Sequence, residues 1–190
     1  MNTPASRILV GMIGRVFWMR VEGKGTFQNS LQAKSAFQGV IARGVRSLVV
    51  DLDRCPMMDS TFLGMLTGAA LSMKTTTPPP SDSEGLSVVN ANQRNVQLLT
   101  SLGLHNILNL DTEGKLWAAE REQACAALQQ CAEAQPCTRE LQTLHILDSH
   151  KTLSGVNAEN EIRFHDVIEF LEKELQTHSV TVAHPAPVPA

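Results

Sequence analysis

The stretch that decides the fold is residues 48–64, which read LVVDLDRCPMMDSTFLG. Its first five residues are apolar except for Asp51, and a short apolar run of this kind is typical of a strand buried on both faces. A loop containing Pro56 follows. Ser60 then begins an apolar segment that continues to Lys74 with large side chains at helical spacing. The stretch predicts a buried strand that leads through a loop to the first residue of a helix.

Apolar segments on both sides of this stretch complete an α/β pattern. The predicted helices cover about 29–43, 60–74 and 92–102, and the predicted strands are Ile8–Val10, Val16–Val21, Ser47–Asp53, Leu86–Asn90 and Ile107–Leu110. The order is strand, strand and helix, then strand–helix twice, then a last strand. This order indicates an α/β protein with a small mixed sheet covered by helices.

Composition and charge narrow the possible functions. Hydrophobic residues make up 43% of the 190 residues and charged residues 18%, which supports a packed core. Aromatic residues reach only 4%, and no basic cluster is present in the sequence, so we expect no nucleic-acid partner. The apolar stretch 62–73 is too short to cross a bilayer, and we recognise no signal peptide. A cytoplasmic protein without membrane insertion is therefore expected.

The charge changes along the chain and predicts a boundary near residue 112. Residues 1–112 carry 10 basic and 7 acidic side chains, a net charge of +3, whereas residues 113–190 carry 6 and 12, a net charge of −6. We expect a domain over 1–112, a helical extension over 113–180 and a disordered, proline-containing tail over 181–190.

The extension is predicted to contain three helices. They cover 117–134, 138–153 and a segment that follows the cap residue Asn157. The last helix has an apolar stripe formed by Phe164, Ile168, Leu171 and Leu175. The simpler interpretation is that the stripe packs against the domain or within a helical hairpin, and the alternative is a homodimer contact or a second partner site.

Ser60 is the residue whose position in the sequence most clearly suggests a chemical role. A helix N-terminus has unpaired backbone N–H groups and a partial positive charge, so a phosphate on Ser60 would be accepted without refolding. The phosphate would add about −1.5 to −2 charge to the surface and repel or block a partner that docks on the bare serine. The alternative interpretation is that Asp59 and Ser60 are ordinary helix-capping residues with no further role.

Two glycines lie on the same side of the predicted helix as Ser60. Gly64 and Gly68 follow Ser60 at successive spacings of four, so one stripe of the helix has no large side chain. Each glycine costs roughly 1 kcal/mol of helix stability. Two interpretations are open: a flat face that a partner's backbone approaches closely, and close helix–sheet packing inside the domain.

The segment DSTFLG, residues 59–64, after the strand 48–52 resembles the signature of the STAS domain family, which includes bacterial anti-sigma factor antagonists. VVNAN at 88–92 and LLTSLGL at 98–104 are similar to the family's later strand, helix and turn, and the likeness covers residues 7–112. The resemblance implies a small mixed sheet with helices on one side. It also implies that an anti-sigma factor with serine kinase activity binds the unphosphorylated protein, that phosphorylation of Ser60 breaks this complex, and that a phosphatase restores it.

The resemblance also implies a set of partner-binding residues. Thr61 is the alternative phosphoacceptor, and the whole set is Met58, Asp59, Ser60, Thr61, Phe62, Gly64 and Gly68. The family usually has Gly at the position of Phe62, so this bulky residue is expected to alter the docking surface. The loop Gly23–Phe27 lacks the acidic residue that similar antagonists often carry near the kinase contact.

The sequence gives little support for the hypothesis that the protein is an enzyme. Ser60 has no G-x-S-x-G context, and the sequence contains no H-E-x-x-H motif and no Walker phosphate loop. The six-residue spacing of Cys125, Cys131 and Cys137 is a poor match to zinc sites, and His145 and His150 are expected on different sides of a helix.

We therefore expect no metal, no cofactor and no catalytic activity, with Cys55 as a buried structural residue. Two other functions stay open. One is a STAS binding subunit of a transporter or a stress-sensing complex, and the other is an enzyme with an unrecognised Cys or His site.

Overall fold

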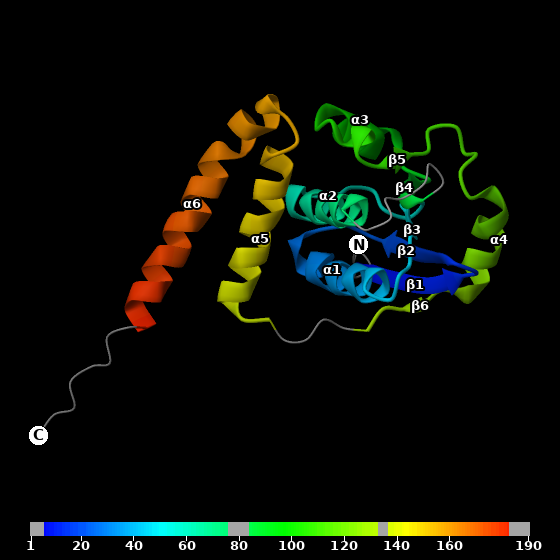
Figure 1. The fold of residues 1–190 in the computed structure, drawn as a ribbon, viewed down its shortest axis with the longest axis horizontal. Coiled ribbons are helices and arrows are strands. Elements are labelled where there is room, and N and C mark those ends of the chain that lie inside the picture. Colours follow the sequence, from blue (N-terminus) through cyan, green and yellow to red (C-terminus); the bar gives the residue numbers. More distant parts are fainter. Residues whose placement is uncertain (1–5, 76–83, 133–136, 183–190) are drawn as a thin grey trace, which may run out of the picture.

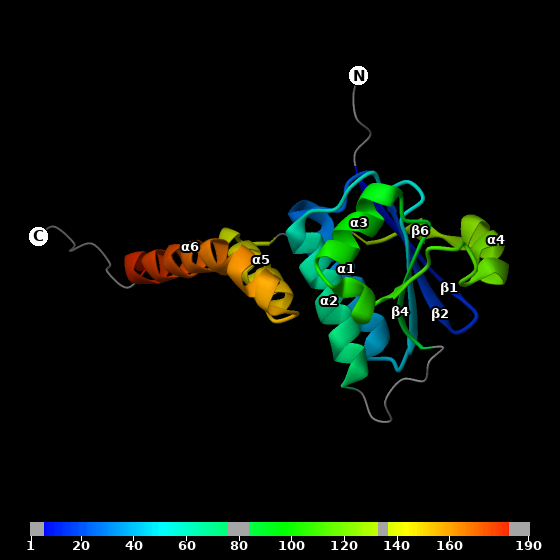
Figure 2. The same cartoon turned by 90° about the horizontal axis from the view of Figure 1, so that it is seen from above.

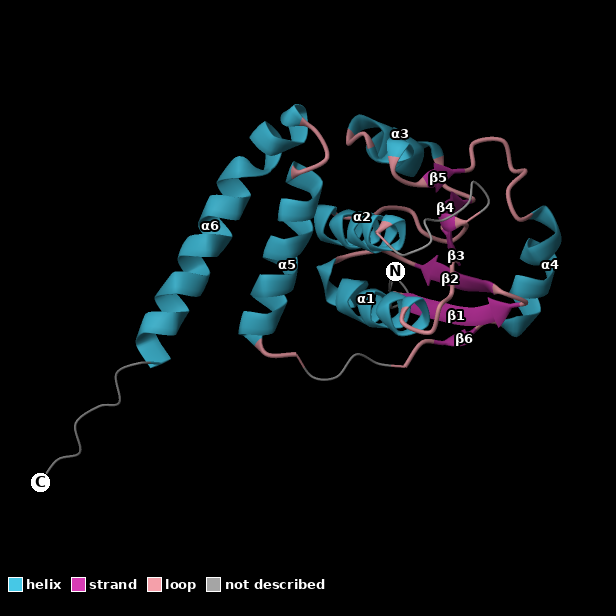
Figure 3. Cartoon of the chain, viewed as in Figure 1, coloured by secondary structure: helices cyan, strands magenta, loops and turns pink. Residues whose placement is uncertain are grey.

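The protein is described here by a computed structural model that covers residues 6–75, 84–132 and 137–182. Its centre is a mixed sheet with the strand order β5-β4-β3-β2-β1-β6 (Figures 1 and 3). Strands β2 to β5 run parallel, and β1 is antiparallel to both of its neighbours. The strands are β1 (Arg7–Ile13), β2 (Val16–Glu22), β3 (Ser47–Asp51), β4 (Gly85–Val89), β5 (Asn109–Leu110) and β6 (Gln129–Gln130). The predicted α/β class with a mixed sheet is confirmed.

The helices form layers on both sides of this sheet. They are α1 (Phe27–Ile41), α2 (Ser60–Lys74), α3 (Gln93–Ser101), the short 3-10 helix η1 (Leu104–Asn106), α4 (Ala118–Ala127), α5 (Arg139–Ser154) and α6 (Ala158–Val182). Figure 2 shows α1, α2 and α3 on one face of the sheet and α4 on the other. The α5–α6 hairpin lies outside α1 and α2 and makes a further layer.

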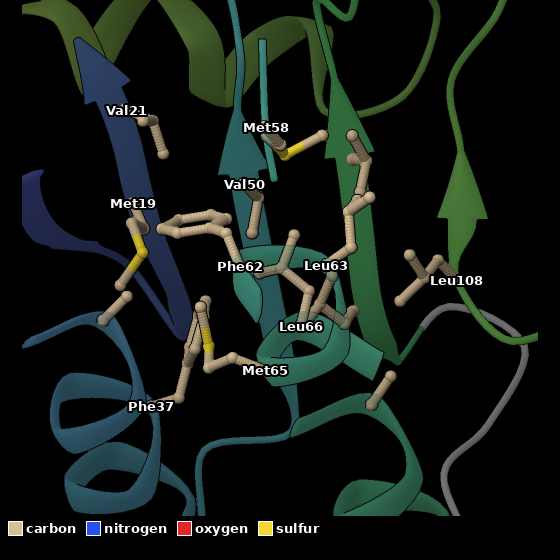
Figure 4. Close-up of a cluster of buried hydrophobic side chains, with 14 of the residues drawn as sticks. Met19, Val21, Phe37, Val50, Met58, Phe62, Leu63, Met65, Leu66 and Leu108 are labelled. Atoms are coloured by element: carbon tan, nitrogen blue, oxygen red, sulfur yellow. The ribbon is translucent and has the colours of Figure 1, made fainter. Parts of the chain in front are cut away.

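The main core lies between the sheet and the layer of α1 and α2. Side chains of β3 alternate between the two faces of the sheet, so Leu48 and Val50 join this core, whereas Val49 points to the other face. Phe62, Leu63 and several methionines fill the space beneath α2 (Figure 4). The prediction of a strand buried on both faces is therefore correct for β3.

Helix α4 corrects the expectation of helices on one side of the sheet. Trp18, Val49 and Val89 point away from α1 and α2 and would be exposed if that face were open. Ala124 of α4 packs on them, with Trp117 beside it, and none of the three strand residues is accessible to solvent. The need to bury this apolar face explains why the chain returns after β5 to cover it.

The predicted helix over 117–134 ends early. Leu128 has an extended backbone and packs into the cluster under α4, and the next two residues pair with β1 as the edge strand β6. Gly11 of β1 makes this approach possible, because a Cβ atom there would lie 3.2 Å from the carbonyl oxygen of Ala127. Part of the predicted extension is thus built into the sheet.

Helices α5 and α6 form an antiparallel hairpin (Figure 1). Phe164 and Leu171 are buried, while Ile168 and Leu175 are half-buried. This arrangement agrees with the interpretation of the apolar stripe as hairpin packing, and the homodimer contact stays a prediction. Helix α6 includes residues 181 and 182, and the rest of the predicted tail, residues 183–190, lies outside the described residues. No described helix is both long and apolar enough to span a membrane.

Candidate functional site: the Ser60 face of helix α2

Asp59 fixes the position of Ser60. One carboxylate oxygen of Asp59 accepts a hydrogen bond from the backbone N–H of Phe62 at 2.9 Å, and the other accepts from the N–H of Phe27 at 2.8 Å. A single side chain therefore caps α2 and also holds the first residue of α1. The N–H of Asp59 donates to the carbonyl oxygen of Gly25 at 2.9 Å. These bonds hold Ser60 in place as the first residue of α2.

The loop before Ser60 is held by side-chain amides from the next helix. The carbonyl oxygen of Cys55 accepts hydrogen bonds from Asn92 and Asn95, at 3.0 and 2.8 Å. Cys55 is buried, and burial raises the pKa of its thiol, which disfavours the reactive thiolate. The expectation of a structural cysteine is consistent with this environment.

Three residues of the predicted partner-binding set lie in the interior. The side chains of Met58, Thr61 and Phe62 are all buried, and Figure 4 shows Met58 and Phe62 among the core side chains beneath α2. Phe62 also packs against the backbone of Gly25, where an added Cβ would lie 3.0 Å from its ring. The expectation that Phe62 alters the docking surface is therefore wrong for this structure, because its ring points away from that surface.

Ser60 is half-buried rather than open. Its Oγ lies 2.9 Å from Nε2 of His150 in α5, and Nδ1 of His150 lies 2.9 Å from the carbonyl oxygen of Ile146. A carbonyl oxygen can only accept, so Nδ1 carries the proton in a neutral ring and Nε2 accepts from the Ser60 hydroxyl. The sequence predicted an exposed hydroxyl, but here it is engaged by the protein's own C-terminal hairpin.

The glycine stripe explains how α5 comes so close. A Cβ atom at Gly64 would overlap the carbonyl oxygen of Ser149 and would lie 2.8 Å from the Cα of Ser149. At Gly68 an added Cβ would first meet the side chain of Thr152, at 3.9 Å, which is an ordinary contact. Gly64 is therefore required for the packing of α5 on α2, whereas Gly68 is not. This is close packing of two helices, which neither sequence interpretation named.

Helix α5 also reaches α1. Nε2 of His145 lies 2.7 Å from the hydroxyl of Ser30, and Lys34 forms an ion pair with Asp148 at 2.8 Å. Burial, followed by the nearby charge of Lys34, lowers the pKa of His145 to about 4, so this imidazole is neutral at pH 7. The two histidines were expected on different sides of a helix. Both instead point toward α1 and α2, where His145 bonds to Ser30 of α1 and His150 bonds to Ser60 of α2.

The described residues give no support for metal binding or for a reactive cysteine at this site. In the part of the chain that the structure describes, no three His, Cys, Asp or Glu residues come together in a way that could hold a metal ion. Cys131 is buried like Cys55, and burial raises the pKa of its thiol. Cys125 and Cys137 are exposed, and neither thiol lies near Ser60 in sequence or is bonded to it. What the arrangement offers is a face covered by a helix, with the hydroxyl groups of Ser60 and Ser30 as its hydrogen-bonding groups.

Solved structures with this arrangement of elements include anti-sigma factor antagonists. One from Mycobacterium paratuberculosis matches with a TM-score of 0.51 at 20% sequence identity, over 64% of this chain and 99% of that chain. The unphosphorylated form of SpoIIAA matches at 0.47 and 15% identity, over 61% and 97%. The phosphorylated form of SpoIIAA from Bacillus matches at 0.45 and 18%, over 60% and 98%. No family model and no curated protein sequence matches the chain.

The chain has the STAS fold. The first match covers nearly the whole of the mycobacterial protein but leaves more than a third of this chain without a counterpart. The resemblance seen in the residues around Ser60 is thus confirmed at the level of the fold. At this sequence identity the match speaks for the STAS architecture, and the role of the site has to be argued from its own residues.

Proposed function

We propose that this protein is an anti-sigma factor antagonist of STAS type, which binds a protein partner through the face of α2 that carries Ser60. The observation that supports this role is the position of Ser60, held by the Asp59 cap as the first residue of α2 with its hydroxyl on the side away from the sheet. The partner would be an anti-sigma factor with serine kinase activity, and its sigma factor would be released when the STAS protein binds.

Phosphorylation of Ser60 would end this interaction. The kinase transfers the γ-phosphoryl group of ATP to Oγ of Ser60, the hydroxyl proton is lost, and ADP leaves. The added charge of about −1.5 to −2 lies at a helix N-terminus, which tolerates it, but on a surface that the partner must desolvate. A phosphatase would then hydrolyse the phosphoserine and restore binding. Thr61 is a poor acceptor by comparison because its side chain is buried.

The direct test is a pulldown from the native organism with the full chain as bait, comparing wild type with Ser60→Asp and Ser60→Ala. We expect an anti-sigma factor with a kinase domain to be enriched by wild type and Ser60→Ala and to be lost with Ser60→Asp. Ser72→Ala is the matched control, because Ser72 is exposed at the far end of α2 and its hydroxyl bonds only to its own helix at Ala69.

Incubation of the purified partner and ATP with each variant adds a chemical readout by intact mass. Wild type and Ser72→Ala should gain the mass of one phosphate, and Ser60→Ala should not. Equal capture by wild type and Ser60→Asp would contradict the switch. Enrichment of a transporter ATPase in place of a kinase would contradict the sigma-factor pathway and favour a transporter-associated STAS subunit.

A further inference from the structure

The Ser60 face is already occupied in this protein. We define it by the outward stripe of α2, Ser60, Gly64 and Gly68, together with Ser30 and Lys34 of α1. Helix α5 crosses this face on the side away from the sheet (Figures 1 and 2). The proposed partner would need the same face, so α5 and the partner exclude each other.

Helix α5 lies at short range over three small residues of this face, Ser60, Ser30 and Gly64. His150 accepts from Ser60, His145 bonds to Ser30, and the backbone of Ser149 lies directly on Gly64. Water can replace the two hydrogen bonds when the helices separate, whereas the contact of Ser149 with Gly64 is a close backbone approach. A further polar contact lies beside the turn between α5 and α6, where the side-chain amide of Asn160 donates to the carbonyl oxygen of Leu102 at 3.0 Å.

Helices α5 and α6 also contact each other, independently of the sheet and of α1 and α2. Arg139 pairs with Glu174 at 2.9 Å, and Lys151 pairs with Glu172 at 2.6 Å. The ring of Phe164 lies 5.5 Å from the ring of His150. Leu153 and Phe164 belong to the main core, and Val156, Val167 and Ile168 pack against it, so release of the hairpin also exposes apolar side chains. The hairpin therefore docks through one side only, and contacts between α5 and α6 hold its two helices together.

An open groove lies beside α5 on the same face. It has a volume of about 450 Å³ between α1 and α2, and its lining includes Phe37, Met65 and Gly68, with Asp148 and Thr152 of α5 on its border. An incoming helix can therefore make its first contacts next to α5 before α5 has left. The groove and the α5 site form one continuous surface.

We propose that the α5–α6 hairpin is a resident ligand of the Ser60 face, and that a partner helix must displace it in order to bind. The partner helix that fits this face presents a small residue to Gly64 and a hydrogen-bond acceptor to Ser60, as α5 does with Ser149 and His150. The same hairpin covers the phosphoacceptor, so a kinase reaches Ser60 only after release. The competition with a partner rests on the proposed function, whereas occupation of the face by the hairpin does not.

Hydrogen exchange on the full chain tests the docking. Gly64→Ala should accelerate amide exchange in residues 139–154 by about tenfold or more, because the added Cβ overlaps the Ser149 carbonyl group. Gly68→Ala is the matched control: it adds the same methyl group to the same helix, meets Thr152 at an ordinary distance, and should leave exchange within about twofold. Equal exchange in the two variants would overturn the close docking of α5.

A second experiment asks whether the face binds a helix hairpin in trans. The probe is a fluorescein-labelled peptide with the sequence of residues 138–177, and its binding is read by anisotropy. Wild type should not bind it, because its own hairpin holds the face. The double variant His145→Ala, His150→Ala leaves α1 and α2 intact and should bind the peptide, and adding Gly64→Ala should abolish this binding. Leu144→Ala, an exposed change in α5, should behave like wild type.

If wild type binds the peptide as strongly as the double variant does, the resident-ligand proposal is overturned. Light scattering that shows a dimer with exchanged hairpins would also overturn it, since the occupant would then be a second copy. Circular dichroism establishes that the double variant is folded, and an unfolded double variant would itself overturn the claim that the hairpin is a separable ligand. If docking and peptide binding behave as expected but the double variant captures no kinase, the proposed function fails and the resident ligand stands.

Discussion

The two faces of helix α2 differ in what they contact and in how firmly. The inner face packs Phe62 and Leu66 into the main core, where neither side chain is accessible to solvent. The outer face has Ser60, Gly64 and Gly68, and it contacts α5 through a hydrogen bond and a close backbone approach. One helix thus has an apolar side in the core and an outer side that, as we propose, exchanges its contacts.

The proposed function gives the two sides of this helix different roles, one structural and one regulatory. Water offers large apolar side chains no contact that compensates for their burial, so we expect the inner face to keep α2 on the sheet when α5 is released. Hydrogen bonds and small residues give the outer face a definite shape at a modest net gain, because water or another helix can replace each contact. The experiments below change one face at a time and are ordered by the size of the expected effect.

The inner face should dominate the free energy of unfolding. Phe62→Ala removes a fully buried ring and should lower this free energy by about 3 to 5 kcal/mol in urea denaturation. Phe170→Ala is the control, because that ring is 65% exposed on α6 and its loss should change stability by about 0.5 kcal/mol or less. Similar losses in both variants would show that α2 is not anchored by its inner face.

Asp59 joins the two faces, because it caps α2 and holds the start of α1. Asp59→Ala leaves the N–H groups of Phe27 and Phe62 without their acceptor, and we expect a loss of about 2 kcal/mol. The measurement is again urea denaturation, with Asp53→Ala as the control, since Asp53 is exposed in the preceding loop. A loss near zero would mean that the double cap does not position Ser60.

The outer face should depend on pH through His145. Its pKa is about 4 when α5 is docked and near the ordinary value of 6.5 when α5 is released, so the released state binds a proton first. The stabilisation by neutral His145 is complete above about pH 6.5 and is lost as pH falls toward 4. Docking should be weaker by about 1 to 2 kcal/mol at pH 5 than at pH 8.

Exchange of the α5 amides, corrected for the intrinsic effect of pH, measures this dependence. The charged groups that act on His145 are Lys34, Asp148 and Asp59, and Asp148 is itself exposed. His145→Gln keeps a polar side chain beside Ser30 without a titrating ring, so its docking should vary less between pH 8 and pH 5. An equal pH dependence in wild type and His145→Gln would show that another group, and not His145, is responsible for it.

The smallest effect is expected for the central hydrogen bond of the outer face. Ser60→Ala leaves Nε2 of His150 without its donor and should weaken docking by about 1 kcal/mol, which corresponds to about fivefold faster exchange in α5. Ser72→Ala removes a hydroxyl from an exposed position of the same helix and should have no effect on α5. Unchanged exchange in Ser60→Ala would show that the glycine contact alone holds the hairpin.

Much of the STAS fold was predictable from local patterns. The apolar run before Asp51 has the signature of a strand buried on both faces, and the position of Ser60 after an Asp cap follows from helix-capping preferences. The early end of α4 was not predictable in the same way. Residues 117–134 have a helix-forming composition, and only the pairing of Gln129–Gln130 with β1 and the burial of Leu128 end the helix at Ala127.

The direction of individual side chains was harder to predict than the elements. Met58, Thr61 and Phe62 were expected in the partner-binding surface, but they point inward because the first turn of α2 lies directly over the sheet. His145 and His150 have no distinctive sequence motif around them. The polar and small residues on one side of α5, among them Ser149 and Thr152, were the signal that this side packs on a glycine stripe.

The sequence by itself determined strands β1 to β5, most of the helices and the location of Ser60 at a helix N-terminus, because periodicity, caps and turn residues act over a few neighbouring positions. Tertiary structure alone decided that His150 meets Ser60 across 90 residues of chain and that Ser149 lies on Gly64. Such contacts depend on how whole helices pack, and packing is set by the shapes of two surfaces together. A sequence pattern describes each surface separately and does not say which surface will cover it.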